Sequence, residues 1–189
     1  MFMKKSVALS FDKAFSYPFS KAKRMFNIFW LFLPIFGWFA LGGYSVRIVQ
    51  GFAKGRFKEM PAMKFGSDMK LGFFMFLKAI PFVIAVAVAF SILFVISPAL
   101  EAIMELLFGI FVFPMLGINF MKKMTIESFF EFGIAKAVWN NMGDYLIAIL
   151  KSIGLGIIFL LMMIVLVGIP AGMFTKNIFL ADFYRRRVE

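Results

Sequence analysis

Cysteine and histidine are both absent from this chain of 189 residues. Without cysteine the protein has no disulfide, no thiol nucleophile and no thiolate metal ligand. Without histidine it lacks the usual general base and a common zinc ligand. The ten Asp and Glu residues fall mostly at the ends of expected helices, and they form no evident catalytic set. We therefore expect a protein that is not an enzyme and that has no metal site and no cofactor.

Charged residues are also scarce, at 16% of the chain, whereas hydrophobic residues make up 62%. The mean hydropathy is +0.92, and a soluble domain is only about 45–50% apolar. Four uncharged stretches account for the excess, and each reaches or approaches the roughly 20 residues that a helix needs to cross a bilayer. A soluble all-helical protein with a very apolar core is the disfavoured alternative. Unbroken runs such as IPFVIAVAVAFSILFVI also disfavour barrel strands, which alternate apolar and polar residues.

These stretches predict a single membrane domain over residues 1–189, an all-α integral membrane protein. We expect a bundle of about four membrane helices, as the spanning length allows. Pro34 should kink the first helix, because proline removes an intrahelical hydrogen bond. Ser97 and Pro98 should form a tight turn between the second and third helices, since they suit an N-cap and a first helical position. The expected membrane segments are residues 27–46, 71–96, 99–120 and 145–168.

Two further segments have an apolar stripe and a polar remainder, which is typical of amphipathic helices in the headgroup plane. Residues 4–24 carry a valine or phenylalanine at every fourth position, and Pro18 should bend this interfacial helix. Residues 125–142 repeat the pattern, and Trp139 fits an interfacial anchor. The chain has no adequate apolar run before Asp12, so we do not expect a cleavable signal peptide.

Lysine and arginine are unevenly distributed between the loops. Six precede the first apolar segment, six lie in residues 47–70, three in residues 121–144 and four after residue 175, whereas the turn at Ser97 has none. Cytoplasmic loops carry the excess of basic residues. If all four segments cross, the two sides carry nearly equal numbers, whereas a re-entrant first segment places most basic residues on one side. The distribution favours a re-entrant segment with the Ser97 turn outside, and a full crossing stays open.

Several short features follow one another in a distinctive order and spacing, mainly between residues 15 and 80. They are Tyr17-Pro18-Phe19, Pro34, Gly43-Tyr44 with Arg47, Gly55 with Glu59-Met60-Pro61, Phe65-Gly66, Asp68 and Leu71-Gly72, with a weaker match at Phe183-Tyr184-Arg185. In this order they resemble domain-of-unknown-function family 4013, a group of uncharacterised, largely archaeal multi-pass membrane proteins. The resemblance implies a helical membrane fold and implies no activity or substrate. The loop around Lys64 departs from the family, in which it is often acidic.

The densest basic segment lies between the first and second membrane segments. Each Lys or Arg near an anionic leaflet contributes about 1 kcal/mol of attraction, and the net charge is +11. We therefore expect anionic phospholipid headgroups as partners, and no nucleic acid, because no groove-reading motif or stacking surface is evident. The expected headgroup-binding residues are Arg47, Lys54, Arg56 and Lys58, with Lys64 and Lys70 in the same loop.

Four charged residues lie within or beside the membrane segments and are candidates for function, because intramembrane ionisable groups are costly. Lys78 and Lys151 are close to segment starts, so snorkelling to the interface or pairing with Asp68 and Asp144 explains them as well. Glu101 and Glu105 lie one helical turn apart and suit a proton relay, although acids near a helix N-terminus also favour its dipole.

Gly154 and Gly156 form a patch of small residues on the fourth membrane segment. Small residues let membrane helices approach closely, so we expect helix packing here, within the monomer or through self-association.

Together these features predict a non-enzymatic, multi-pass protein of the cell membrane. Its expected role is a lipid-associated scaffold or a subunit of a membrane assembly with other membrane proteins. The alternative is a small transporter or channel for an anionic or small solute, which would use the segments broken at Pro34 and Pro170. Few polar residues lie in the second to fourth segments, and this favours the scaffold.

Overall fold

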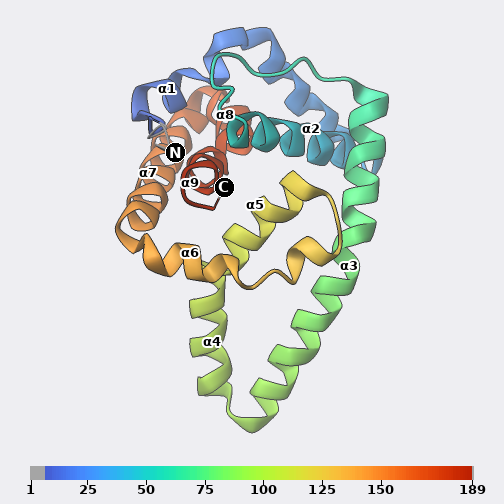
Figure 1. Cartoon of the computed structure of the whole chain (residues 1–189). Coiled ribbons are helices and arrows are strands. Elements are labelled where there is room, and N and C mark those ends of the chain that lie inside the picture. The colour runs from blue at the N-terminus through green and yellow to red at the C-terminus, as the bar shows by residue number, and fades with distance from the viewer. Residues whose placement is uncertain (1–6, 189) are drawn as a thin grey trace, which may run out of the picture.

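The computed structural model describes residues 7–188, apart from the side chain of Val165. Within this range every regular element is a helix, which confirms the all-α prediction. A helical body carries a hairpin of α3 (Phe65–Ile96) and α4 (Pro98–Phe111) that extends away from it (Figure 1). The body consists of α1 (Phe11–Ser16), η1 (Pro18–Phe32), α2 (Phe36–Ala53), α5 (Phe113–Lys123), η2 (Glu127–Phe129), α6 (Ile134–Asn140), α7 (Met142–Leu161), η3 (Met162–Val165), α8 (Gly168–Thr175) and α9 (Ile178–Arg187).

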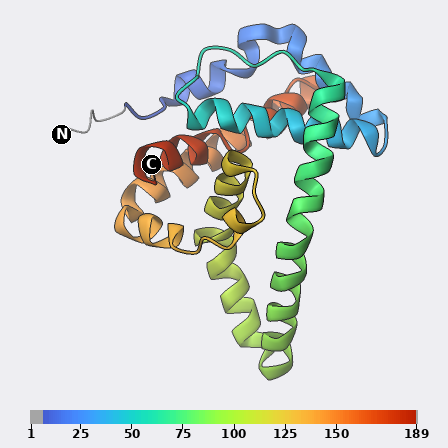
Figure 2. The same cartoon turned by 45° about the vertical axis from the view of Figure 1, so that its right-hand side comes forward.

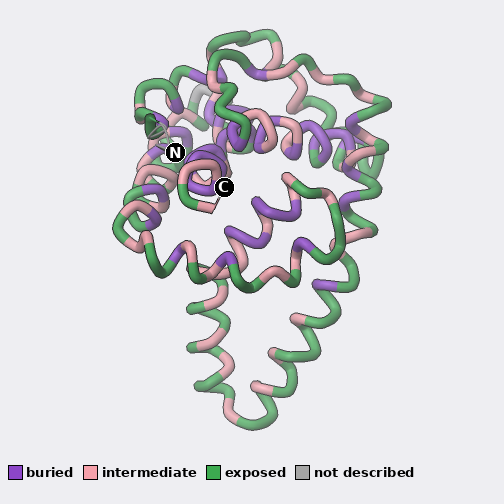
Figure 3. Tube along the Cα trace, in the orientation of Figure 1, coloured by how far each residue is buried: buried purple, intermediate pink, exposed green. Residues whose placement is uncertain are grey.

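The hairpin turn forms as its sequence predicts. The Ser97 hydroxyl accepts a hydrogen bond from the Leu100 amide at 3.3 Å, and Pro98 opens α4. This is an N-cap followed by a proline where no intrahelical donor is needed. Most residues of the hairpin beyond its base are exposed, although they are apolar (Figure 3). Such a surface requires an apolar environment.

Within residues 7–188, two helices are long and apolar enough to cross a membrane on their own. They are α3 and α7, the second of which continues through η3 to Ile164. α4 and α5 form a third candidate together, but they meet at an angle of 46° around Val112. These helices support a membrane protein, whereas the predicted bundle of four crossing helices is not confirmed.

Residues 27–46 do not form one helix, which corrects the first predicted membrane segment. η1 ends at Phe32 and α2 begins at Phe36, so the kink expected at Pro34 is a complete break. Ile35 within the break has φ 66°, which is unusual for a β-branched residue. The resulting turn lies beside α3 (Figure 2), and the rings of Trp30 and Phe65 join the two at a centroid distance of 4.2 Å.

The two expected interfacial segments also differ from simple helices. In the first, α1 ends at Ser16 and η1 begins at Pro18, but Tyr17 keeps helical dihedral angles and the kink lies at Lys21, with φ −141° and ψ 73°. The bend expected at Pro18 therefore occurs three residues later, and residues 4–6 lie outside the described part of the chain. The prediction of one helix over residues 125–142 is wrong, because a turn separates η2 from α6. The position of either segment in a headgroup plane remains a prediction.

α2 and α3 cross at two glycines. A Cβ atom on Gly43 would overlap the backbone carbonyl of Asp68, and one on Gly72 would overlap that of Phe39. Only residues without a side chain permit helix backbones to approach this closely. The crossing fixes the base of the hairpin against the body.

α9 lies in the interior of the body and runs beside α7. Ile178, Phe179, Ala181 and Phe183 are all buried, and the ring of Phe183 packs against that of Tyr145 on α7 at 5.2 Å between centroids. The C-terminal segment, where the sequence shows four basic residues after residue 175, is therefore a core helix.

Candidate functional site

The base of the hairpin is held by an ion pair between α2 and α3. Arg47 donates from Nη1 to both carboxylate oxygens of Asp68, at 2.8 and 3.0 Å, and to the Ala62 carbonyl at 3.1 Å. Asp68 is fully buried and also accepts a hydrogen bond from the Lys64 amide at 2.7 Å. The Asp68 carboxylate thus binds the start of its own helix, where the helix dipole favours negative charge.

The loop before α3 is bound to the same pair of helices. The Tyr44 hydroxyl donates to the Pro61 carbonyl at 2.8 Å, and Arg24 donates to the Met60 carbonyl. Burial raises the pKa of Tyr44 to about 12, so its hydroxyl remains a neutral donor at physiological pH. We call this set of residues the α2–α3 clamp: Arg24, Tyr44, Arg47, the loop 60–62 and Asp68. The polar groups of the clamp hydrogen-bond to one another. The lipid contact expected for Arg47 is not tested by these bonds and remains a prediction.

Lys54, Arg56 and Lys58 project from the loop that follows α2. All three side chains are exposed, and none has a hydrogen-bond or ion-pair partner among residues 7–188. Gly55 between them has φ +71°, a conformation that glycine adopts without strain. The loop therefore presents free cations, as a headgroup-binding segment requires.

The ends of α5 and α9 extend this cationic surface. The guanidinium of Arg185 lies 5.2 Å from the ring of Phe57 in the loop, and the ammonium of Lys122 lies 5.2 Å from the ring of Tyr184. These contacts bring three separate segments together. We call the resulting surface the basic face, and it comprises Lys54, Arg56, Lys58, Lys122, Lys123, Arg185, Arg186 and Arg187.

Asp182 anchors the α9 part of the basic face. Its carboxylate accepts from Arg185 at 2.7 Å, from Arg186 at 3.0 Å and from the Leu9 amide at 2.9 Å. Arg185 also donates to the Val7 carbonyl at 3.0 Å. Asp182 is buried, so its charge requires these partners. These hydrogen bonds connect residues 7–9 to α9.

A second polar network lies between α5, η2 and α9. Tyr184 donates to the side-chain Oδ1 of Asn119 at 2.6 Å, and the Asn119 side-chain amide in turn donates to the Ser128 backbone carbonyl at 2.7 Å and to Glu131 at 3.2 Å. Lys123 binds the same Glu131 oxygen at 2.5 Å. The hydrogen bond from Lys123, aided by that from Asn119, lowers the pKa of the Glu131 carboxyl. Sequence patterns gave no signal for this network, because its members come from three separate segments.

Lys78 and Lys151 both bind backbone carbonyls. Lys78 donates to the Met124 carbonyl at 2.7 Å, and Met124 is the left-handed residue that ends α5. A cation at a helix C-terminus is favoured by the dipole. The ammonium of Lys151 lies 3.5 Å from the Leu9 carbonyl oxygen and 5.9 Å from the ring of Phe179. Both lysines therefore have contacts that connect segments.

The acids that the sequence suggests as partners for these lysines pair elsewhere. Asp68 binds Arg47, and Asp144 binds Arg186 and Arg187 at the end of α9. The pairing hypothesis for Lys78 and Lys151 is therefore wrong, because the tertiary fold supplies closer arginines.

Glu101 and Glu105 lie on α4 near the tip of the hairpin. Glu101 is half-buried and Glu105 is exposed, and neither has an ion-pair partner among the described residues. The described residues therefore do not test the proton relay, which remains a prediction. Across residues 7–188 no three acidic side chains gather into a possible metal site.

Gly154 and Gly156 do not contact another helix backbone closely within the described chain. A Cβ on Gly154 would lie 3.8 Å from the ring of Phe11, and one on Gly156 would meet nothing within 4 Å. The close helix approach occurs at Gly43 and Gly72 instead. Packing of Gly154 and Gly156 across a dimer remains a prediction.

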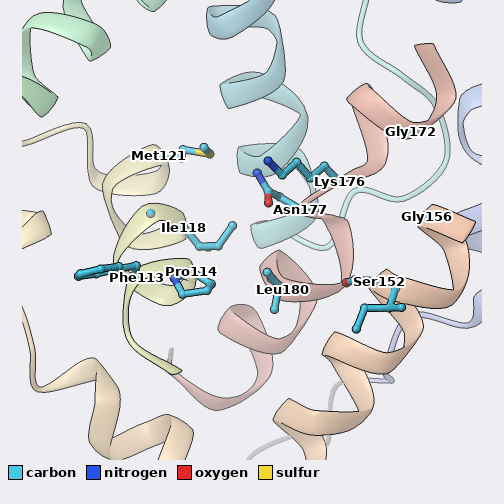
Figure 4. A pocket seen from close by; sticks show the side chains of 12 residues that line it. Phe113, Pro114, Ile118, Met121, Ser152, Gly156, Gly172, Lys176, Asn177 and Leu180 are labelled. Carbon is cyan, nitrogen blue, oxygen red and sulfur yellow. The ribbon is translucent and has the colours of Figure 1, made fainter. Parts of the chain in front are cut away.

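Gly156 instead lines a pocket between α5, α7 and the junction of α8 with α9 (Figure 4). Its volume is about 500 Å³, within the range of small-molecule and cofactor sites. The polar side chains that line it are Ser152, Lys176 and Asn177, and Ser152 is satisfied by the Ala148 carbonyl at 2.9 Å. The apolar wall includes Phe113, Ile118, Met121, Ile153 and Leu180. The sequence does not predict this site, because the residues that line it come from three separate parts of the chain.

Comparison with known proteins identifies the family. A model for the family described as "Protein of unknown function (DUF4013)" matches residues 26–168, which is more than half of the chain. The chain belongs to this family. No curated protein and no solved structure gives a significant match.

The DUF4013 match can be placed on the structure. It contains nearly all of the α2–α3 clamp, the basic loop after α2 and the hairpin, whereas Arg24 and α9 lie outside it. The sequence resemblance to this family is therefore confirmed, and it extends from η1 to the start of α8.

Proposed function

We propose that this protein is a non-enzymatic, multi-pass protein of the cell membrane that acts as a scaffold associated with anionic phospholipids. The observation that carries the proposal is the basic face, where three exposed cations of one loop lie beside the arginines of α9. Its partners would be the headgroups of anionic lipids and, through the exposed helices, other membrane proteins.

The attraction of the basic face to anionic headgroups would come mainly from its unpaired members. Each Lys or Arg near an anionic leaflet contributes about 1 kcal/mol, so Lys54, Arg56 and Lys58 together supply roughly 3 kcal/mol. Arg186 and Arg187 contribute less, because Asp144 already neutralises part of their charge. The loop is therefore the part of the basic face most available to headgroups.

Exposed apolar residues support a membrane location for the rest of the molecule. Phe32 is 80% exposed, and Val95 on the hairpin is 84% exposed. Soluble monomers rarely expose contiguous apolar patches larger than a few hundred Å². In lipid these side chains need no protein partner, so the hairpin and the η1–α2 turn would both be embedded, the turn as a re-entrant segment.

The lipid preference of the reconstituted protein tests this proposal. Wild-type protein in mixed vesicles should enrich spin-labelled phosphatidylglycerol over phosphatidylcholine at its surface, and added salt should reduce the enrichment by screening. The double variant Lys54→Gln/Lys58→Gln should lose most of it. Lys13→Gln/Lys136→Gln removes the same charge from exposed sites of the two expected interfacial segments, outside the basic face, and should reduce the enrichment much less. Equal binding of both lipids by wild type would overturn the proposal.

The alternative is a small transporter or channel, and the pocket beside the bent α4–α5 pair favours it. Helices interrupted near a binding site occur in transporters. Flux of an anionic or small solute into protein-containing liposomes, measured for wild type, Lys78→Gln and Lys151→Gln, distinguishes the two functions. Flux that depends on either lysine would establish the transporter and overturn the scaffold.

A further inference from the structure

We infer that the pocket between α5, α7 and the α8–α9 junction binds one anionic phospholipid, with the phosphate at Lys176 and Asn177 and an acyl chain against the apolar wall. The inference rests on the proposed membrane location and deepens the proposed lipid association. It differs from that association in naming a single site, away from the basic face, with its own residues.

The wall of the pocket suits a hydrocarbon chain. Phe113, Ile118 and Met121 line it from α5, and Ile153 lines it from α7. Leu180 of α9 lies between them (Figure 4). An acyl chain gains from such a surface, because buried apolar area contributes about 25 cal/mol per Å².

Two glycines leave the space that a chain would fill. A Cβ atom on Gly117 of α5 or on Gly156 of α7 would meet nothing within 4 Å. Both residues line the pocket from facing helices. A larger side chain at either position would enter the volume where we place the acyl chain.

Two polar side chains at one end of the pocket are available to bind a ligand. Lys176 and Asn177 extend toward the α5 side of the pocket (Figure 4), and neither side chain has a hydrogen-bond partner within residues 7–188. Asn177 precedes α9 but makes no side-chain capping bond to it. Lys176 is exposed at the mouth of the pocket, so its ammonium is accessible to a ligand from outside the chain. No acidic residue lines this pocket, and the positive charge at its polar end therefore favours an anionic ligand.

A phospholipid satisfies both halves of the pocket better than a free anion. Inorganic phosphate would pair with Lys176 and leave the apolar wall uncovered. A zwitterionic lipid would cover the wall but bring a choline cation near Lys176. An anionic headgroup with a tail matches the charge and the wall together.

Native mass spectrometry of the full chain in detergent tests this site with one ligand at a time. Wild type should bind one phosphatidylglycerol with an apparent Kd about tenfold lower than that for phosphatidylcholine, the ratio that 1.4 kcal/mol of charge-assisted hydrogen bonding produces. Lys176→Gln should remove this preference. Lys136→Gln, on the exposed face of α6, should preserve it. Inorganic phosphate should bind weakly or not at all.

Filling the pocket provides a second test. Gly156→Leu and, independently, Gly117→Leu should abolish the single phosphatidylglycerol site. Gly109→Leu on α4 is the matched control, because a Cβ there also meets nothing within 4 Å, and it should leave the site intact. A folded Gly156→Leu or Gly117→Leu protein that binds phosphatidylglycerol as wild type does would overturn the inference. Binding of free phosphate as tightly as phosphatidylglycerol would also overturn it.

Each of the two lipid proposals can be disproved without disproving the other. If Lys54→Gln/Lys58→Gln abolishes lipid enrichment and Lys176→Gln has no effect, the pocket inference is wrong and the scaffold proposal stands. If Lys176→Gln removes the preference for phosphatidylglycerol while the loop variant matches wild type, the basic face is not the lipid-binding surface and the pocket inference stands.

Discussion

Arg47 and Asp68 join α2 to α3 through two hydrogen bonds of 2.8 and 3.0 Å, and the Asp68 side chain is completely buried. Both residues lie within the segment that the DUF4013 family model matches. The structure assigns them to one clamp, which fixes the loop of residues 60–62 and the base of the long hairpin. Arg47 therefore has a positioning role whether or not it reaches a lipid.

Removal of Arg47 should destabilise the protein strongly. Arg47→Met keeps the length of the side chain but leaves the Asp68 carboxylate buried without its charge partner. Breaking a buried ion pair costs about 3–5 kcal/mol, and because Arg47 is partly exposed we expect a loss of about 3 kcal/mol. Thermal unfolding in detergent measures it. The control Lys54→Met removes an unpaired exposed cation and should change the melting temperature little. Equal melting temperatures for Arg47→Met and wild type would contradict a structural clamp.

The glycine crossing gives a second prediction. Gly43→Val introduces a Cβ against the Asp68 carbonyl and should separate α2 from α3, at a cost of at least about 1–3 kcal/mol from overpacking. Gly42→Val, one residue earlier, projects into space without neighbours within 4 Å and should be tolerated. Size-exclusion profiles and melting curves of the two variants test this contrast. Similar behaviour of both would show that the crossing is not tightly packed.

Glu131 should make stability depend on acidic pH. Its pKa in the folded protein lies below the ordinary value of 4.5, chiefly because Lys123 donates a hydrogen bond to it. A depressed pKa means that its stabilising contribution is present above pH 4.5 and is lost as the pH falls through the lower folded value. Glu131→Gln should flatten this part of the stability profile. The effect should be small and sensitive to salt, because both side chains are partly exposed. An unchanged acid slope in Glu131→Gln would contradict it.

The sequence predicts the elements that depend on local chemistry. The helical class follows from the unbroken apolar runs, and the turn at Ser97 and Pro98 follows from capping preferences. The break at Pro34 follows from the restrictions that proline imposes on its neighbours, since Leu33 before it is extended. These features need no knowledge of tertiary contacts.

The sequence is less informative about where an apolar helix lies, because hydropathy does not distinguish a helix buried within the protein from one buried in lipid. α2 is apolar because it packs within the body, so hydropathy alone counted residues 27–46 as one membrane segment. α9 contains Asp182 and three arginines and reads as a polar tail, yet tertiary ion pairs make it a core helix. The pocket near Lys176 arises only when α5, α7 and α9 come together, and no local pattern marks it.

The orientation of the hairpin tests the central claim, a membrane protein whose basic face lies on the leaflet opposite the hairpin tip. The natural absence of cysteine permits single labels at Ala22→Cys in η1, Ala62→Cys in the α2–α3 clamp and Ala99→Cys at the tip, all exposed positions. An impermeant maleimide applied to intact cells should label Ala99→Cys alone. Ala22→Cys and Ala62→Cys should become reactive together once the membrane is permeabilised. Labelling of Ala62→Cys and Ala99→Cys from the same side would contradict the account, because α3 would then not cross.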